Sequence, residues 1–335
     1  MKRTGREGFA WRAMASPVQL LLPSLGEEEA GNLARRVASD LIASEQALSR
    51  FWPGSDLTRL NSHLGEWVPV PRRLRLALVA ARRAKRLSGG VFDAAVLQRL
   101  EALGYPGAPL PDVGRRQGGE AISVDSRRGL ARLQAPVDLG GIGKGLAIRW
   151  ASRVICQTTP HFLLNIGGDI SLGGTAGDDG GWLVGVEDPL EVGGLVAALR
   201  LAGPSACATS STARHRWRLG SRLVHHLIDP ATGEPVRTDL LAVTVLHDDP
   251  AWAEVHTKVL FAAGKAAIRE RAAGMAALWV DEEGRVGWTK ALSGHLTWVA
   301  DGRAAPGAPA QPREREGEVW RGGFETWEAP RGAGT

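Results

Sequence analysis

The sequence lacks most of the features that would place a protein in a membrane or in an oxidising compartment. Its 335 residues contain only two cysteines, Cys156 and Cys207, which form no Cys-x-x-Cys pair and cannot build a zinc site alone. One disulfide would be compatible with this count, but a reduced intracellular pair is the simpler interpretation. No apolar run approaches 18 residues, so the sequence predicts no membrane insertion.

Targeting and nucleic-acid signals are also missing. The first 17 residues, MKRTGREGFAWRAMASP, are basic but contain no apolar stretch of the signal-peptide kind, and no cysteine follows them for lipid attachment. We therefore expect a soluble, cytoplasmic protein. The net charge of +5 comes mainly from arginines spread along the chain, without a Lys/Arg tract interleaved with aromatic residues. This distribution argues against a nucleic-acid partner.

The chain has enough apolar residues, 44 %, for a large core, and their spacing indicates mixed secondary structure. Helical periodicity predicts helices over 26–51, 72–90, 91–105 and 251–274, and turn residues predict a loop over 49–61. Short apolar runs predict strands over 161–174, 181–189, 194–203 and 241–249, and a hairpin over 275–289. Helices come early and no regular βαβ alternation follows, which favours the α+β class over a doubly wound sheet.

Composition divides the chain into three parts. Residues 1–10 are expected to be a disordered start, and 11–300 form the folded domain. From 301 to 335 the chain is rich in Ala, Pro, Gly and charged residues and is interpreted as a tail.

One stretch, VDLGGIGKGLAIRWA over 137–151, carries the strongest signal for a ligand. It fails the P-loop pattern, because Asp138 stands where the first glycine is needed and Gly145 replaces the Ser or Thr. It also fails the dinucleotide pattern Gly-x-Gly-x-x-Gly. Glycines followed by a lysine at a helix start still favour a phosphate group, since free N–H groups and positive charge meet there. The alternative is a plain tight turn with Lys144 in solvent.

Seven further segments accompany this stretch in a fixed order. They are Met14, SRFWPGSDLTRLN and GGVFDAAV before the stretch, and LLNIGGDI, CATSST, HHLIDPATGEPV and AEVHTKVLFAAG after it. Together they resemble the FAD:protein FMN transferase family, also called ApbE-like, and the resemblance spans 13–300. Single motifs of this kind are weak, whereas eight in order are specific.

The resemblance implies an enzyme that uses FAD as its substrate. Such an enzyme cleaves the FAD pyrophosphate, attaches FMN to a threonine of an acceptor flavoprotein and releases AMP, with magnesium assisting. The implied fold is an α+β domain, with mixed sheets, packed helices and an FAD groove between two subdomains. The partner would carry a short threonine-containing loop, and we expect it to be reachable from the cytoplasm.

Matching the motifs residue by residue implies a set of FAD contacts. These positions are Met14, Phe51, Val91, Phe92, Asp93, Asp138, Lys144, Thr209, Ser210 and Ile228. Lys144 is expected near the phosphates and is therefore also a catalytic candidate. Phe51 stands where the family more often has Tyr, and the alternative for Phe92 taken alone is core packing.

His226 is the candidate acid or base. The resemblance places a histidine beside the reacting phosphate, and the ordinary pKa of an imidazole suits proton transfer from a threonine hydroxyl. The alternative is a structural histidine that bonds the following turn. Asp229, Pro230 and Gly233 are interpreted as turn-forming residues rather than as chemical groups.

The metal positions depart from the family pattern. The resemblance implies that a backbone carbonyl, at Gly141 here, and a helical Asp with a Thr four residues later bind the metal. In this chain Glu254 and Lys258 occupy the two helical positions. An ammonium group has no lone pair for a metal, so Lys258 puts the implied magnesium in question.

Two interpretations of this helix remain open. Lys258 can replace the metal as a fixed cation, which we favour and which makes it a third catalytic candidate. Otherwise Glu254 and Lys258 form only a surface pair, and metal-dependent catalysis is lost. A register shifted by one residue would bring Thr257 to the ligand position, but only with a distorted helix.

Three functions therefore follow from the sequence. The leading hypothesis is FMN transfer to a protein threonine. A related outcome is FAD pyrophosphatase activity, in which water replaces the threonine. The alternative from another class is an FAD-binding protein without catalysis.

Overall fold

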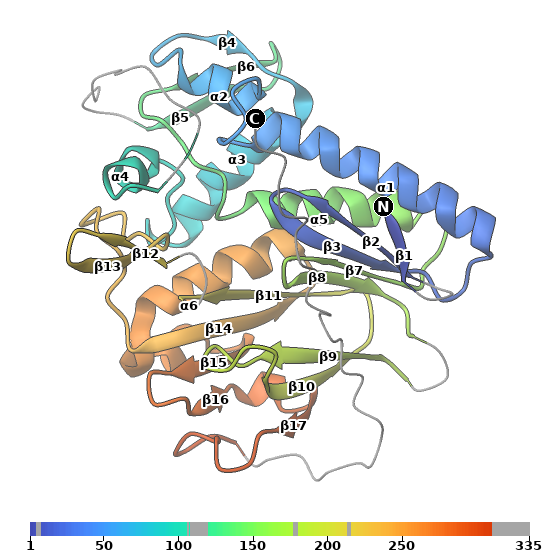
Figure 1. The fold of residues 1–335 in the computed structure, drawn as a ribbon. Coiled ribbons are helices and arrows are strands. Elements are labelled where there is room, and N and C mark those ends of the chain that lie inside the picture. Colours follow the sequence, from blue (N-terminus) through green and yellow to red (C-terminus); the bar gives the residue numbers. More distant parts are fainter. Residues whose placement is uncertain (5–7, 106, 108–119, 177–179, 213–215, 310–335) are drawn as a thin grey trace, which may run out of the picture.

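The centre of the protein is a nine-stranded sheet, shown in the computed structural model of Figure 1. The structure describes residues 1–4, 8–105, 107, 120–176, 180–212 and 216–309. All neighbouring strands of this sheet are antiparallel. In spatial order they are β1 (Lys2–Thr4), β2 (Gly8–Ala13), β3 (Ser16–Leu21), β7 (Phe162–Ile166), β8 (Asp169–Gly173), β11 (Ser205–Ser211), β14 (Leu240–His247), β15 (Ala276–Asp281) and β16 (Val286–Trp288).

Each face of this sheet is covered by a different layer (Figure 1). Three helices, α1 (Glu27–Leu48), α5 (Gly143–Ile155) and α6 (Pro250–Arg271), pack on one face. The other face packs against a three-stranded sheet of β9 (Trp182–Glu187), β10 (Leu195–Leu201) and β17 (Leu296–Val299). Short helix η1 spans Lys290–Leu292. This mixture of sheets and helices confirms the expected α+β class.

A further core lies at the ends of α1, α5 and α6 (top of Figure 1). Its elements are α2 (Asp56–Asn61), α3 (Arg72–Leu87) and the small sheet of β4 (Val68–Pro69), β5 (Ile122–Asp125) and β6 (Leu130–Leu133). Helix α4 (Leu97–Ala102) and the hairpin of β12 (Arg216–Leu219) and β13 (Arg222–His225) lie nearby. The candidate site forms where this core meets the central sheet.

The three longest predicted helices are confirmed as α1, α3 and α6. In α1 the buried stripe of Leu33, Val37 and Leu41 repeats every four residues, and three glutamates in the first turn complement the positive end of the helix. Helix α6 begins with Pro250 after Asp249, whose carboxylate accepts a hydrogen bond from the amide of Ala251 (2.9 Å).

Two local predictions are wrong, and side-chain caps explain both. The second half of the expected loop is helix α2, because the hydroxyl of Ser55 accepts a hydrogen bond from the amide of Thr58 and caps its start. The expected helix over 91–105 is reduced to α4. Its first residues form a turn instead, in which Ser88 accepts a hydrogen bond from Phe92 and Asp93 accepts one from Ala95.

The strands expected over 161–174, 181–189, 194–203 and 241–249 and the hairpin over 275–289 are confirmed. The expected disordered start differs from the structure, where Lys2–Thr4 pairs with β2 and Phe9 is buried. In the expected tail, Ala304 forms a bridge to Val286, and residues 310–335 lie outside the described part, as do most of 106–119. Among the described helices, none combines the length and apolarity that crossing a membrane requires.

Candidate active site

The glycine stretch forms the start of α5, and two of its glycines are there for close approach. A side chain on Gly145 would lie 2.5 Å from the Cα of Ala251 at the start of α6. A side chain on Gly141 would lie 2.8 Å from the ring of Phe92 and 3.3 Å from the aliphatic stem of Lys258. The contacts of 2.5 Å and 2.8 Å are shorter than real Cβ atoms show, and the contact of 3.3 Å is tight, so these glycines let α5, α6 and the Phe92 turn meet.

Lys144, in the first turn of α5, is held by a carboxylate rather than lying free in solvent. Its Nζ is 2.5 Å from Oδ2 of Asp169 on β8, and the Asp169 side chain is only 4 % exposed. The other oxygen of Asp169 accepts a hydrogen bond from the amide of Thr209 on β11 (3.2 Å). The alternative of a solvated Lys144 is therefore wrong. Asp169 is not among the residues predicted from the sequence, although it lies in the quoted segment LLNIGGDI.

Glu254 and Lys258 form a second lysine–carboxylate pair on α6. Nζ of Lys258 lies 3.5 Å from Oε1 of Glu254 and also donates a hydrogen bond to the Glu254 carbonyl (3.2 Å). Oε2 of Glu254 accepts a hydrogen bond from the amide of Gly145 (2.8 Å). Glu254 is 2 % exposed, so the interpretation as a mere surface pair is wrong.

Burial raises the pKa of Glu254 above its ordinary value, because the charged carboxylate loses hydration. The positive charge of Lys258 opposes that rise, and the negative charge of Asp169 adds to it. Lys144 and the Gly145 amide also favour the ionised form. The two pairs therefore lie close enough to act on each other and make up one charged centre.

Thr257 does not serve as a substitute ligand for this centre. It is fully buried, and its hydroxyl donates to the Glu254 carbonyl (2.7 Å) and contacts the hydroxyl of Ser210 (2.6 Å). Ser210 is itself buried at this contact between β11 and α6, whereas its neighbour Thr209 is exposed and contacts Thr244. The predicted FAD contacts of Thr209 and Ser210 remain predictions.

A second group of side chains lies beside the glycine stretch. Oδ1 of Asp138 accepts a hydrogen bond from the amide of Gly140 (2.7 Å), and its Oδ2 is 3.4 Å from Nε of Arg50. The guanidinium carbon of Arg50 lies 4.4 Å from the ring centroid of Phe51, which is about half exposed. Arg50 is not among the residues predicted from the sequence, although it stands directly before Phe51.

His226 joins this group through an aromatic neighbour. Its imidazole is stacked on the ring of Tyr105, with centroids 6.3 Å apart, and Tyr105 also contacts Phe51 edge to face at 6.1 Å. Burial and the charge of Asp138 raise the pKa of Tyr105, while Arg50 and Lys144 oppose the rise. The phenol therefore lies within electrostatic range of both Asp138 and Lys144, and it connects the two groups.

The other predicted contacts lie at turns of the chain. Met14 and Ala15 form the two-residue turn between β2 and β3, both in the left-handed region, with φ of 53° and 56°. Such strained non-glycine positions are common at functional sites. The Met14 amide donates to Glu45 on α1 (3.2 Å).

The Phe92 turn and the Ile228 turn complete the set. Phe92 is buried against Gly141, while the neighbouring Asp93 pairs with Lys85 (2.6 Å) and Val91 is half-buried. Ile228 forms an isolated bridge with Pro235, in the turn made by Asp229. The turn-forming role of Asp229 is confirmed by its hydrogen bonds to the amide of Ala231 and the hydroxyl of Thr232, and its carbonyl accepts from the amide of Gly233.

The residues at the expected metal position do not fit magnesium. Mg²⁺ prefers six oxygen ligands and commonly uses one or two carboxylates. Here Oε2 of Glu254 accepts a hydrogen bond from the Gly145 amide. The ammonium of Lys258 lies beside Oε1, which accepts no hydrogen bond from the part of the chain that the structure describes. Within the described ranges, no group of three or more His, Cys, Asp or Glu side chains could hold a metal ion.

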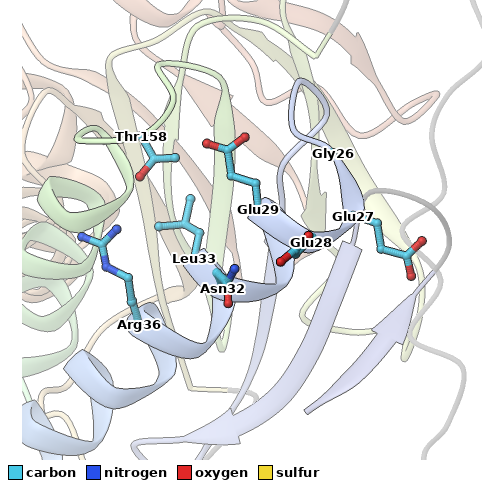
Figure 2. A pocket seen from close by; sticks show the side chains of 8 residues that line it. All are labelled: Gly26, Glu27, Glu28, Glu29, Asn32, Leu33, Arg36 and Thr158. Atoms are coloured by element: carbon cyan, nitrogen blue, oxygen red, sulfur yellow. The ribbon is translucent and has the colours of Figure 1, made fainter.

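A surface pocket lies elsewhere, at the first turns of α1. Figure 2 shows its lining, which includes Glu27, Glu28, Glu29 and Arg36 but none of the candidate site residues. Three glutamates would repel a pyrophosphate, so we do not assign this pocket to FAD.

Comparison with known proteins decides the family. The model of the ApbE family matches residues 14–279. The chain belongs to the ApbE family. The FAD:protein FMN transferase of Escherichia coli K12 is 25 % identical over 297 residues, covering 83 % of this chain and 82 % of that protein. A Klebsiella pneumoniae protein of the same name is 29 % identical over 276 residues, covering 77 % and 84 %.

Solved structures show that this ApbE-family chain also shares the family's fold. The ApbE protein of Thermotoga maritima superposes with a TM-score of 0.74 at 23 % identity, covering 85 % of this chain and 97 % of that one. The flavin transferase ApbE of Vibrio cholerae gives a TM-score of 0.71 at 22 % identity, covering 86 % and 98 %. The expected FAD groove between two subdomains remains a prediction.

Proposed function

We propose that this ApbE-family chain is an FAD:protein FMN transferase, which cleaves the FAD pyrophosphate and attaches FMN to a threonine of an acceptor flavoprotein. One observation carries the proposal. Two lysine ammonium groups, of Lys144 and Lys258, are each held by a buried carboxylate beside the first turn of α5. Fixed positive charge at a helix start is what a pyrophosphate needs for binding and for charge neutralisation.

The transfer step follows from the chemistry of the pyrophosphate. The threonine hydroxyl oxygen attacks the phosphorus on the flavin side and forms a new P–O bond. The bond from that phosphorus to the bridging oxygen breaks, and AMP leaves with the bridging oxygen. His226 is the group proposed to accept the hydroxyl proton. Lys144 and Lys258 stabilise the negative charge that gathers on the phosphate oxygens.

Lys258 is proposed to supply the charge that magnesium supplies in the family pattern. Its ammonium lies beside Glu254 and its stem packs on Gly141, the two residues matched to metal ligands. Because Lys258 is proposed to supply this charge, the reaction should not need an added divalent metal. A chelator cannot remove a side-chain cation and should therefore not stop the reaction. Asp169 and Glu254 hold the two lysines in place and limit the number of positions that each ammonium can take.

The test measures AMP and FMN release from FAD, with added magnesium, with EDTA, and with an acceptor domain that carries the threonine loop. We expect covalent flavin on the acceptor and release of AMP that survives EDTA. Release that requires magnesium would contradict the role of Lys258. FMN and AMP without acceptor labelling would indicate a pyrophosphatase. Tight FAD binding with no AMP in any condition would indicate a binding protein.

Two substitutions separate binding from turnover. Lys258→Met removes the ammonium but keeps much of the stem, and we expect it to lower AMP release at least about 100-fold, as loss of one preorganised charge typically does. Lys290→Met, at an exposed lysine of η1, is the matched control and should change nothing. His226→Ala should retain FAD binding and lower turnover about 100- to 10,000-fold, leaving a slow but measurable release of AMP. Unchanged turnover in both Lys258→Met and His226→Ala would contradict the proposed roles.

The identity of the acceptor and the place of the reaction are also proposals. We propose a cytoplasmic acceptor flavoprotein with a threonine-containing loop. Incubating the protein and FAD with fractionated cell extract, followed by in-gel flavin fluorescence, would test this. A fluorescent band in the soluble or cytoplasm-facing fraction supports it, and labelling confined to exported proteins contradicts it.

A further inference from the structure

Tyr105 has no role in the family pattern described above, yet its ring is the point where three rings from separate segments meet. It stacks on Trp217 of β12 with centroids 5.0 Å apart and planes inclined by 27°. It stacks on His226 at 6.3 Å and 25°, and it meets Phe51 edge to face at 6.1 Å and 78°. These separations lie within the range of favourable aromatic pairs.

The backbone around Tyr105 is fixed by the end of helix α4. The amide of Tyr105 donates to the carbonyl of Leu100 (2.9 Å), and the amide of Gly104 donates to the carbonyl of Glu101 (2.8 Å). Gly104 has a φ of 79°, so these bonds form a Schellman motif, which needs a left-handed residue at this place. The direction of the tyrosine side chain is therefore set by local structure and not by a loose loop.

Two further contacts fix the surroundings of the Tyr105 ring. The indole N–H of Trp217 donates to the carbonyl of Leu103 (2.6 Å), which holds Trp217, the stacked partner of Tyr105, at the same end of α4. The guanidinium carbon of Arg50 lies 4.8 Å from the Tyr105 ring centroid. Arg50 is buried, and none of its three guanidinium nitrogens makes a hydrogen bond within the described residues, so its charge is balanced by Asp138 at 3.4 Å and by the two ring faces.

From this geometry we infer that Tyr105 is a positioning residue, which orients the His226 imidazole for its proton transfer by ring stacking. The inference rests on the proposed function, because it takes the role of His226 from there. Stacking needs the ring and not the hydroxyl. The contribution of Tyr105 should therefore survive in Tyr105→Phe, be lost in Tyr105→Leu, and vanish when His226 is absent.

The experiment is a double-mutant cycle on AMP release from FAD, with Tyr105→Leu, His226→Ala and the combined variant. We expect Tyr105→Leu to lower kcat about 3- to 10-fold, the size of one aromatic stacking contact, with a smaller change in KM. Tyr105→Phe should stay within about twofold of the parent protein. In the His226→Ala background, Tyr105→Leu should cause no further loss, because the group through which it acts is gone.

A merely structural tyrosine would give a different pattern. Tyr105→Leu would then lower turnover by the same factor in both backgrounds, and that additivity would overturn the inference. Trp67→Leu provides the control. Trp67 is a partly exposed aromatic residue whose ring contacts Arg132 and is not one of the rings that meet Tyr105. It should leave kcat unchanged.

A spectroscopic measurement tests the contact when a variant is too unstable for kinetics. Tyr105 is the chain's one tyrosine, so protein labelled with 3-fluorotyrosine gives a single ¹⁹F resonance. His226→Ala should shift this resonance, and Trp67→Leu should not. An unshifted resonance in His226→Ala would overturn the stacking. If the parent protein releases no AMP with any acceptor, the proposed function fails, and this measurement decides the contact by itself.

Discussion

At the residue scale, the site depends on charges that lie where water is scarce. Asp169 and Glu254 are both almost fully buried, and each faces a lysine. Breaking a buried pair costs more than forming it gains, because the remaining charge is left without hydration. This cost keeps each lysine beside its carboxylate. Replacing either lysine should therefore lower the stability of the fold as well as turnover.

A pH effect on stability follows from two histidines. Burial lowers the pKa of His256, with the nearby His247 adding to the effect, and burial also lowers the pKa of His225. Each is easier to protonate in the unfolded chain than in the folded one. The contribution of these two histidines to the free energy of unfolding should therefore fall as the pH drops below the ordinary value of 6.5, down to their lowered pKa values in the folded state.

Urea unfolding between pH 7.5 and pH 5 measures this effect. His256→Gln should reduce the loss of stability over this range, and a variant that also carries His225→Gln should reduce it further, because both groups act in the same direction. The raised pKa of Glu254 acts in the opposite direction in the parent protein and in the variants alike, so the test compares the variants with the parent. A change in the free energy of unfolding between pH 7.5 and pH 5 that is the same in the variants as in the parent, or a steeper fall in the variants, would contradict the prediction.

At the element scale, the site depends on how closely α5 and α6 cross. The Cα of Gly145 on α5 lies against Pro250 and Ala251 on α6, and the Gly145 amide donates a hydrogen bond to Glu254, also on α6. Gly145→Ala should push the helices apart and lower the free energy of unfolding by about 1–3 kcal/mol, the range of overpacking in a well-packed core.

Gly31→Ala on α1 is a matched control for this change. A side chain there meets only the end of Arg35, at 3.8 Å, so the same substitution should stabilise the helix by about 0.5–1 kcal/mol. Urea unfolding of both variants gives the comparison, and AMP release should fall only in Gly145→Ala. Equal effects on stability at the two positions would show that the helix crossing has room to spare.

What the sequence could predict at this scale depends on the range of the interactions. Helices such as α1 are visible because their apolar stripe and their first-turn charges lie within one segment. The short helix α2 and the turn before α4 were mispredicted, because single side-chain caps at Ser55, Ser88 and Asp93 decided them. Strand β11 was missed because its run SACATSS is short in large apolar residues.

At the scale of the whole molecule, strand pairing joins segments that are far apart in the chain. β3 pairs with β7 and β8 pairs with β11, so the sheet order could not be read from local patterns. The motifs indicated the family, and through it the candidate site residues, whose roles remain predictions. They did not indicate Arg50 or Tyr105, which matter because of neighbours contributed by distant segments.

Because the site draws on both the central sheet and the core around α2 and α3, FAD binding should stabilise the protein as a whole. A ligand that binds only the folded state adds about 2.7 kcal/mol at 100 times its Kd, which corresponds to about 4 to 8 °C in Tm for a domain of this size. We expect this shift in thermal unfolding with FAD, and we expect EDTA to leave it unchanged, because Lys258 is proposed to supply the charge of the metal. Lys144→Ala should reduce it, because Lys144 is proposed to bind the phosphates. A shift in the parent protein that EDTA abolishes would restore a metal to the site, and an undiminished shift in Lys144→Ala would place FAD elsewhere.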